Sequence, residues 1–158
     1  MAFQTENPDQ SPTDAARHVI DANSYLTLAT ADRDGRPWAT PVWFAALDLR
    51  DFVWVSRPGT RHSRNIAERA EVAMTVFDST VAVGDAIAVY VEAVAGEVGE
   101  ADRAAALAVF NARSVARGIR EWQETDVTGT APHRLYRARA SEVFVLDERE
   151  QRVPVPVE

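Results

Sequence analysis

The residues from Ser56 to Asn65 have the types and the spacing that favour binding of a phosphate group. A Pro-Gly turn follows Ser56, and a short helix dense in hydroxyl, guanidinium and imidazole groups is predicted to start at Thr60. A helix N-terminus offers free backbone N–H groups, and hydroxyl and guanidinium groups add charge-assisted hydrogen bonds. Basic side chains there oppose the helix dipole, which a bound anion would relieve. The alternative is a solvated basic turn that pairs with surface carboxylates.

The charge composition excludes some classes of binding partner. The chain has a net charge of −7, from 17 basic and 24 acidic residues, which argues against nucleic acid as a main partner. Every basic residue is arginine, so a phosphate anchor or a Schiff base that needs lysine is excluded. Together with the abundant alanine, this bias fits a GC-rich genome such as that of an actinomycete.

Several kinds of chemistry have no support in the sequence. The chain has no cysteine, which excludes disulfides and thiolate sites. The three histidines, His18, His62 and His133, lie in different segments without metal-ligand spacing, so no metal site is predicted. Neither a triad nor a pair of carboxylates is recognisable, and the catalytic residues stay unknown. No signal peptide and no apolar run long enough for a bilayer is seen, which predicts a soluble cytoplasmic protein.

Short alternating segments predict most of the elements that position these residues. A helix is expected to start at Ser11-Pro12 or at Thr13 and to end near Asn23, with Ser or Thr as its cap. Two further helices are expected over Thr60–Arg69 and from Ala101 to about Ile119. The expected strands are Tyr25–Thr30, Trp38–Leu47, Phe52–Ser56, Val72–Asp78, Ala86–Gly99, Arg134–Ala140 and Glu142–Asp147. Strands joined by hairpins predict a mainly β (α+β) fold, an antiparallel barrel with flanking helices, and not a parallel sheet.

The whole chain, 1–158, is predicted to form a single domain. Residues 1–11 are expected to be disordered, and the tail 148–158 is expected to be extended without regular pairing because proline recurs in it. Pro41 cannot donate to a strand ladder, so the strand that contains it should be an edge strand or carry a bulge. Asp34-Gly35 predicts a hairpin turn, since glycine tolerates positive φ. Ser141 is a possible bend between the two last strands.

The stretch from Tyr25 to Asp78 resembles the FMN-binding split-barrel family of pyridoxamine 5'-phosphate oxidase relatives. The resemblance implies an antiparallel split β-barrel with a flavin that is held by one strand, one strand end and one turn. It places the flavin ring against Thr40, Pro41, Val42 and Trp43, and the phosphate against Val55, Ser56, Thr60, Arg61 and His62. His62 stands where the family commonly has lysine, so the phosphate charge would depend more on Arg61.

The resemblance also implies a function. It indicates a homodimeric oxidoreductase with FMN at the subunit interface, which transfers hydride to or from a small organic substrate. A deazaflavin-dependent reductase of the same fold, a non-catalytic flavin or haem binder, and a structural split barrel without cofactor are the alternatives. Pyridoxamine phosphate oxidation itself is not favoured, because the family's C-terminal substrate segment is not recognisable in Ser141–Glu150.

Aromatic residues outside the predicted phosphate site have less specific roles. Trp54 is expected in the core, whereas Trp43 lies on the strand that the family uses for ring contacts. Trp122 either covers a partner subunit's cofactor or packs on the surface.

Three arginines at helical spacing form a further candidate for a binding surface. Arg113, Arg117 and Arg120 would share one face of the longest predicted helix. This face is either solvated and paired with acids, or a basic rim that recruits an anionic substrate.

Overall fold

The computed structural model describes residues 11–82, 86–146 and 151–157. The elements in that part of the chain are α1 (Pro12–Ala22), β1 (Tyr25–Ala31), β2 (Pro37–Trp43), β3 (Ala45–Leu47), β4 (Asp51–Ser56), α2 (Arg61–Glu68), β5 (Glu71–Phe77), β6 (Ala88–Glu97), α3 (Glu100–Ala116), the 3-10 turn η1 (Glu124–Asp126), β7 (Arg134–Leu146) and β8 (Arg152–Val155). No helix in these residues is long and apolar enough to cross a membrane. Of residues 1–11, for which disorder is predicted, Ser11 is instead the N-cap of α1, and residues 1–10 lie outside the described part.

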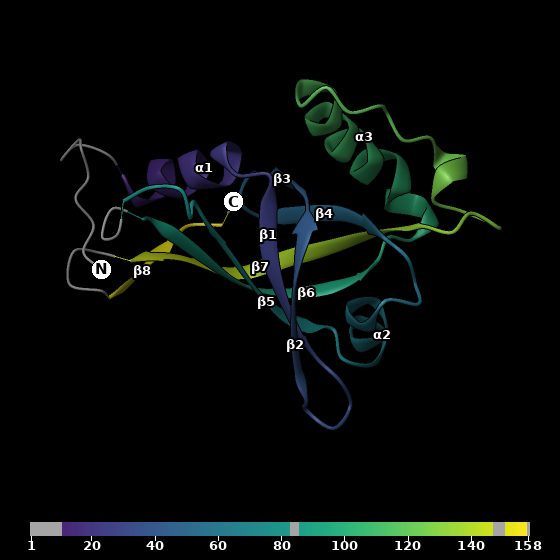
Figure 1. Cartoon of the computed structure of the whole chain (residues 1–158), viewed down its shortest axis with the longest axis horizontal. Helices are drawn as coiled ribbons and strands as arrows, with labels where there is room; N and C mark the ends of the chain where they lie inside the picture. The colour runs from purple at the N-terminus through teal and green to yellow at the C-terminus, as the bar shows by residue number, and fades with distance from the viewer. Residues whose placement is uncertain (1–10, 83–85, 147–150, 158) are drawn as a thin grey trace.

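The strands form one curled antiparallel sheet, a half-barrel with helices at its flanks (Figure 1). Their order is β2-β1-β5-β6-β7-β4-β3, and β8 joins β7 at the side. The predicted antiparallel split barrel is therefore confirmed. Inward-facing residues of these strands, among them Leu28, Met74, Val91 and Trp54, fill the barrel together with the apolar stripe of α1. The expectation of a core position for Trp54 is confirmed.

The hairpin of β1 and β2 forms as the turn residues predict. The backbone N–H of Gly35, which has a φ of 82°, donates to the Asp32 carbonyl at 2.9 Å. The Asp32 side chain accepts hydrogen bonds from the N–H groups of Asp34 and Arg36. β2 is an edge strand of the described sheet, which confirms the position inferred from Pro41.

The strand expected over Trp38–Leu47 is interrupted in the structure, which corrects that prediction. β2 ends at Trp43 and pairs with β1, whereas β3 starts at Ala45 and pairs with β4 at the other edge of the sheet. Phe44 is buried inside the barrel, and its neighbour Ala45 is buried in a second cluster under α3. Consecutive side chains point to opposite faces, and the change of pairing partner between Trp43 and Ala45 shows that the chain passes from one edge of the sheet to the other.

The described part of the tail is extended as predicted, but the expectation that it does not pair regularly was wrong. β8 pairs in antiparallel register with β7, and Val155 lies opposite Val143 while Pro154 lies opposite Phe144. β8 has a strand partner on one side only among the described residues, so a proline there interrupts no second ladder. The burial of Val155 in the barrel core explains why the tail is retained against the sheet.

The two predicted closing strands form one strand, β7, with a bulge. Glu92 of β6 pairs with Glu142, and Ala93 pairs with Ala140, so Ser141 is the extra residue. The Ser141 hydroxyl donates to the Glu92 carbonyl at 3.0 Å. The bend proposed at Ser141 is thus a β-bulge, a feature that changes the direction of a strand within a sheet.

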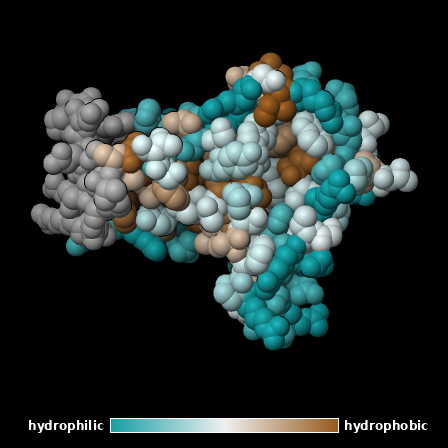
Figure 2. Space-filling view, viewed as in Figure 1, coloured by the Kyte–Doolittle hydropathy of each residue, from teal (hydrophilic) through white to brown (hydrophobic). Residues whose placement is uncertain are grey.

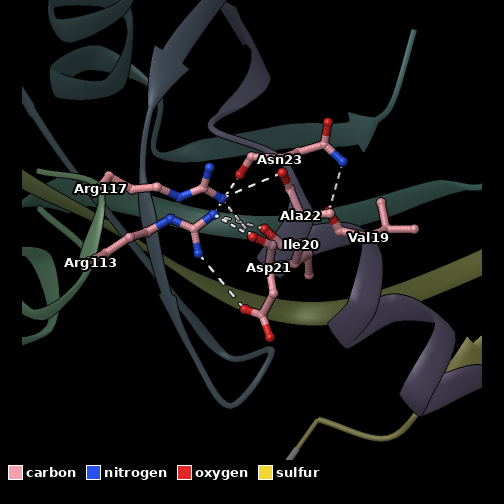
Figure 3. A network of polar contacts seen from close by, with 7 residues as sticks. All are labelled: Val19, Ile20, Asp21, Ala22, Asn23, Arg113 and Arg117. Carbon is pink, nitrogen blue, oxygen red and sulfur yellow. Dashed lines mark hydrogen bonds and ion pairs between the residues drawn. The ribbon is translucent and has the colours of Figure 1, made fainter. Parts of the chain in front are cut away.

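The longest helix ends earlier than predicted, and two of its arginines bind α1. α3 ends at Ala116, and Gly118 follows with a φ of 70°, so Arg120 lies beyond the helix. Figure 3 shows the guanidinium groups of Arg113 and Arg117 directed at the carbonyl groups that end α1. Arg113 donates to the Ile20 carbonyl at 3.0 Å, and Arg117 donates to the Asp21 carbonyl at 2.8 Å.

These contacts confirm the acid-paired alternative in part and correct the rest. Arg113 lies 3.8 Å from the Asp21 carboxylate, but Arg113 and Arg117 also donate to carbonyl groups of α1 and so join two helices, which neither alternative predicted. Cations at a helix C-terminus stabilise the dipole and satisfy the last carbonyl groups. Arg120 instead pairs with Asp126 at 2.9 Å and lies over the Trp122 ring.

Candidate cofactor site

The end of β4 and the start of α2 bring three of the predicted phosphate residues into direct contact. The Nε2 atom of His62 lies 2.7 Å from Oγ of Ser56 and 3.1 Å from Oγ1 of Thr60. Thr60 is the N-cap of α2, and its hydroxyl accepts a hydrogen bond from the Ser63 N–H. Its own backbone N–H donates to the Arg57 carbonyl at 3.1 Å, which closes the turn. The predicted strand, turn and helix are therefore confirmed locally.

His62 is directed into the protein. The residue is only 8% exposed, and burial lowers the pKa of its imidazole because the charged form loses solvation. His62 is therefore neutral near pH 7 and supplies hydrogen bonds at this position, not a positive charge. This placement leaves charge compensation for an anion to the neighbouring arginines.

Arg61 is directed toward solvent and contacts an aromatic ring of β2. Its guanidinium carbon lies 4.7 Å from the centroid of the Trp38 ring. The first turn of α2 contains no acidic residue, and within the described residues Arg61 makes no hydrogen bond and no ion pair. In the same part of the chain, the backbone N–H groups of Arg61 and His62 have no acceptor. A helix start with these free donors suits an anion.

The other two arginines of the cluster differ from Arg61. Arg64 donates to the Gly59 carbonyl and so is used within the turn. The Arg57 side chain is exposed and, like that of Arg61, makes no hydrogen bond or ion pair within the described residues, but Arg57 precedes the Pro58-Gly59 turn and is not part of the helix start. Of the three, Arg61 is the one that stands at the helix N-terminus with its donors unused among the described residues.

A buried polar contact that the sequence did not reveal joins α2 to the hairpin. The Asn65 amide donates to the Thr30 hydroxyl at 2.9 Å, and both side chains are buried. The buried face of α2 consists of His62, Ser63, Asn65 and Ile66. Their spacing of three and four was visible in the sequence, but three of the four are polar and so do not form an apolar stripe.

A second hydroxyl lies beneath the same face. Burial raises the pKa of Tyr136, whereas a hydrogen bond with Ser63 acts in the opposite direction. The Tyr136 ring stacks on Trp54 with a centroid distance of 5.9 Å. The inner surface of α2 is therefore held by a continuous set of polar and aromatic contacts, which fixes the position of the helix start.

The residues predicted to contact a flavin ring lie on the edge strand β2, next to α2 and β4. Val42 is buried in the barrel core, Thr40 is half-buried and Pro41 is exposed. Trp43 packs edge-on against Phe110 of α3, with ring centroids 4.7 Å apart. The Trp43 side chain is thus used in packing, and what β2 offers a ligand is mainly backbone. Val55 is half-buried near the end of β4 and packs on the cluster under α3.

Trp122 packs within its own chain. Asn111 of α3 exchanges two hydrogen bonds of 2.8 Å with the Trp122 backbone, and the indole meets Phe110 and His133 edge-on. A groove of about 770 Å³ runs between α3 and residues 121–124, with Trp122 in its lining. None of the predicted cofactor residues lines this groove. In the described part of the chain, no three acidic or histidine side chains are grouped so that they could hold a metal ion.

Comparison with known proteins identifies the family of this chain. The sequence profile of the pyridoxamine 5'-phosphate oxidase family matches residues 12–147, and the chain therefore belongs to that family, whose fold is the split barrel. A search among curated protein sequences finds no match.

Solved structures share the fold at low sequence identity. A heme binding protein from Mycobacterium smegmatis is 18% identical, with a TM-score of 0.73 over 94% of this chain and 59% of that protein. The heme storage protein HutZ from Vibrio cholerae is 20% identical, with a TM-score of 0.65 over 86% and 95% of the two chains. A FAD-binding protein from Mesorhizobium loti is 23% identical, with a TM-score of 0.60 over 85% and 92%. This chain thus spans about three fifths of the mycobacterial protein.

Proposed function

We propose that this protein binds FMN non-covalently and acts as an oxidoreductase on a small organic substrate. The observation that carries the proposal is the start of α2, where Arg61 and the first backbone N–H groups have no acceptor among the described residues. A charged donor set of this kind, beside the hydroxyls of Ser56 and Thr60, matches the phosphate of a flavin mononucleotide. Membership in the pyridoxamine 5'-phosphate oxidase family supports the same cofactor class.

The residues present fit the two parts of such a cofactor. Ser56, Thr60 and Arg61 would hold the phosphate, with His62 behind them as a neutral hydrogen-bonding partner of both hydroxyls. The backbone of Thr40–Trp43 would contact the ring, because β2 has no strand partner on its outer side among the described residues. When bound, the flavin would supply the electron chemistry, and the protein would supply binding and orientation.

We further propose a homodimer that is formed through the outer face of the sheet. Residues on this face alternate with the buried ones, and the register of β1, β5 and β6 places Tyr25, Phe77 and Val94 on it. All three are exposed. Tyr25 and Phe77 lie level with each other on this face, whereas Val94 lies opposite Glu71 at the other end of β5. Exposed apolar residues on one sheet face are typical of a protein interface. Figure 2 shows that the hairpin end of the molecule, below the body, has a hydrophilic surface.

Haem is the second candidate ligand, because two of the solved structures with this fold are described as heme-binding or heme storage proteins. The described histidines offer limited support for an axial ligand. The Nε2 atom of His62 is already shared by two hydroxyls, His133 packs on Trp122, and His18 is exposed on α1. A deazaflavin with the same arrangement of ring and phosphate remains the alternative within the reductase class.

The deciding experiment is a ligand titration of the purified protein after removal of anything that absorbs visible light. FMN, riboflavin, hemin and a phosphorylated deazaflavin are compared by absorbance and fluorescence, and released ligand is identified by mass. FMN should bind at least tenfold more tightly than riboflavin, because each charge-assisted phosphate contact contributes roughly 1.5–3 kcal/mol. Equal titration curves for FMN and riboflavin contradict the phosphate site. A Soret band with no flavin binding would select the haem alternative.

Oxidoreductase activity needs a separate measurement. The FMN-loaded protein is mixed with a reduced nicotinamide and, independently, with a reduced deazaflavin, and steady-state oxidation is followed by absorbance. Turnover above that of free FMN supports an enzyme. Stable flavin binding without turnover by any donor would instead indicate a carrier or sensor.

A further inference from the structure

Trp38 is a large aromatic residue at the exposed start of an edge strand, where the fold does not require one. It is 39% exposed and belongs to neither buried cluster. Its one recorded ring contact within the described residues is the Arg61 guanidinium. We propose that Trp38 is a positioning residue, whose ring holds Arg61 at the N-terminus of α2 so that its N–H groups are directed at a bound phosphate. This inference rests on the phosphate site of the proposed function.

The register of the hairpin places Trp38 where it can do this. Trp38 lies opposite Thr30 in the ladder of β1 and β2, so both side chains are on the same face. Thr30 accepts the hydrogen bond from Asn65 in the second turn of α2, and Trp38 meets Arg61 in the first turn. One cross-strand pair of the hairpin therefore contacts two successive turns of the helix. The buried hydrogen bond between Asn65 and Thr30 fixes the distance between hairpin and helix. The exposed contact between Trp38 and Arg61 limits the orientation of the arginine side chain.

The chemistry of the contact explains why an aromatic ring suits this position better than a carboxylate. A guanidinium carries its five N–H donors in its plane, and an aromatic ring attracts the cation through the ring face. A carboxylate would bind those same in-plane donors and would neutralise the charge that attracts phosphate. An aromatic neighbour limits the movement of the arginine side chain and leaves all five N–H donors available to a ligand. It also reduces the side-chain freedom that Arg61 must lose when it binds.

The surroundings of Arg61 make such a neighbour necessary. No acidic residue occurs in the first turn of α2, and the helix dipole repels a cation at this end. His62, the next residue, is directed inward and is neutral, so it does not compete for an anion but also does not attract one. Apart from Trp38, the Arg61 side chain has no hydrogen-bond, ion-pair or ring partner in the described part of the chain.

The test separates the phosphate contribution from the rest of flavin binding. The ratio of riboflavin to FMN dissociation constants is measured for wild type, Trp38→Leu and Trp38→Tyr by fluorescence titration. Trp38→Leu should lower this ratio about three- to tenfold, with riboflavin affinity unchanged, because only the phosphate contact depends on Arg61. Trp38→Tyr should restore most of the ratio, since tyrosine keeps a ring face.

A double-mutant cycle with Arg61→Ala completes the test. If Trp38 acts through Arg61, Trp38→Leu should have no further effect on the ratio once Arg61 is alanine. Circular dichroism and urea unfolding confirm that each variant is folded. As a measurement without flavin, the NMR signal of the Arg61 Nε–H group should show a ring-current shift that Trp38→Leu removes and Trp38→Tyr retains.

The outcomes are distinct. An unchanged ratio in Trp38→Leu, or additive effects of the two substitutions, overturns the role of Trp38 while leaving the phosphate site intact. A wild-type ratio of one overturns the phosphate site itself and with it this role, even if the ring-current shift is present. Loss of FMN and riboflavin affinity together in Trp38→Leu would mean that Trp38 contacts the flavin ring, which also contradicts the proposal.

Discussion

The Nε2 atom of His62 lies 2.7 Å from the Ser56 hydroxyl, and this contact connects the last residue of a strand to the first turn of a helix. The same nitrogen lies 3.1 Å from the hydroxyl of Thr60, the N-cap of that helix. One buried imidazole thus holds both hydroxyls of the proposed phosphate site in place. A neutral imidazole suits this role because its ring nitrogen can hydrogen-bond without carrying a charge.

The stability of the protein should decrease at acidic pH because of His62. Burial lowers the pKa of His62 in the folded state, whereas in the unfolded chain it returns to about 6.5. Below about pH 6.5 the unfolded state binds a proton that the folded state does not, so the free energy of unfolding falls as the pH drops. Above about pH 6.5 the contribution is fully present. Urea unfolding at pH 7.5 and 5.5 measures the difference.

The matched comparison uses two histidines. His62→Gln should show a smaller loss of stability between pH 7.5 and 5.5 than wild type, whatever its stability at pH 7.5. His18→Gln, at an exposed position of α1, should lose as much stability between pH 7.5 and 5.5 as wild type does. The same pH dependence in wild type and His62→Gln would contradict the assignment.

Arg61→Ala should weaken FMN binding by about 2–3 kcal/mol, or roughly 30- to 150-fold, and leave riboflavin binding unchanged. The reason is that Arg61 supplies the charge at the start of α2, where His62 is neutral and lysine is absent. Arg57→Ala and Arg64→Ala should cost clearly less. Fluorescence titration of the three variants checks this, with circular dichroism for folding. The position assigned to the phosphate is wrong if Arg61→Ala binds normally while Arg57→Ala or Arg64→Ala fails.

Arg113→Ala should destabilise the fold by about 2–3 kcal/mol. Arg113 is half-buried, donates to the Ile20 and Asn23 carbonyls, and lies 5.0 Å from the centroid of the Phe44 ring. Its loss leaves helix-end carbonyls of α1 without that donor, and hydrogen bonds to charged groups are each worth about 1.5–3 kcal/mol. Arg117→Ala is the control, because Arg117 is exposed and should cost less than about 1 kcal/mol. Urea unfolding of both variants tests the difference, which equal losses would refute.

Asp48→Gly should stabilise the protein by about 0.5–1 kcal/mol. Asp48 and Leu49 connect β3 to β4 with φ values of 52° and 59°, a left-handed conformation that costs most residues about 1–2 kcal/mol. Glycine adopts it without that cost, although it makes the unfolded chain more flexible. Leu49→Gly is the contrast, because the Leu49 side chain is buried and its removal should destabilise by more than the relieved strain. Thermal unfolding of the two variants should give shifts of opposite sign.

Val94→Glu should convert the proposed dimer to a monomer. Val94 is 55% exposed on the outer sheet face, so a charge there is harmless to a monomer but would be buried in an interface. Val115→Glu is a matched control, since Val115 is 56% exposed on α3, away from that sheet face. Sedimentation at micromolar concentration distinguishes the states. A wild-type monomer that still binds flavin would remove the dimer proposal.

Short-range chemistry in the sequence determined much of the proposed site. Ser11 and Thr60 cap their helices as predicted, and Gly35 takes the positive φ of the hairpin turn. These features depend on residues a few positions apart, so they can be derived without knowledge of the fold. The alternation of apolar and polar residues likewise predicted most of the strands. The sequence also excluded lysine and thiol chemistry outright, because the residues are absent.

The partner that each charged or aromatic side chain contacts depends on the tertiary structure. Composition cannot tell that Arg113 meets the end of a helix about 90 residues away, or that Arg61 meets Trp38. An arginine can bind a carboxylate, a carbonyl or a ring, and the choice depends on which element the fold brings near. The same holds for Phe44, where the chain crosses between two cores, and for Val155, which the barrel retains despite the prolines beside it. Contacts between distant segments are made by packing, which local periodicity does not encode.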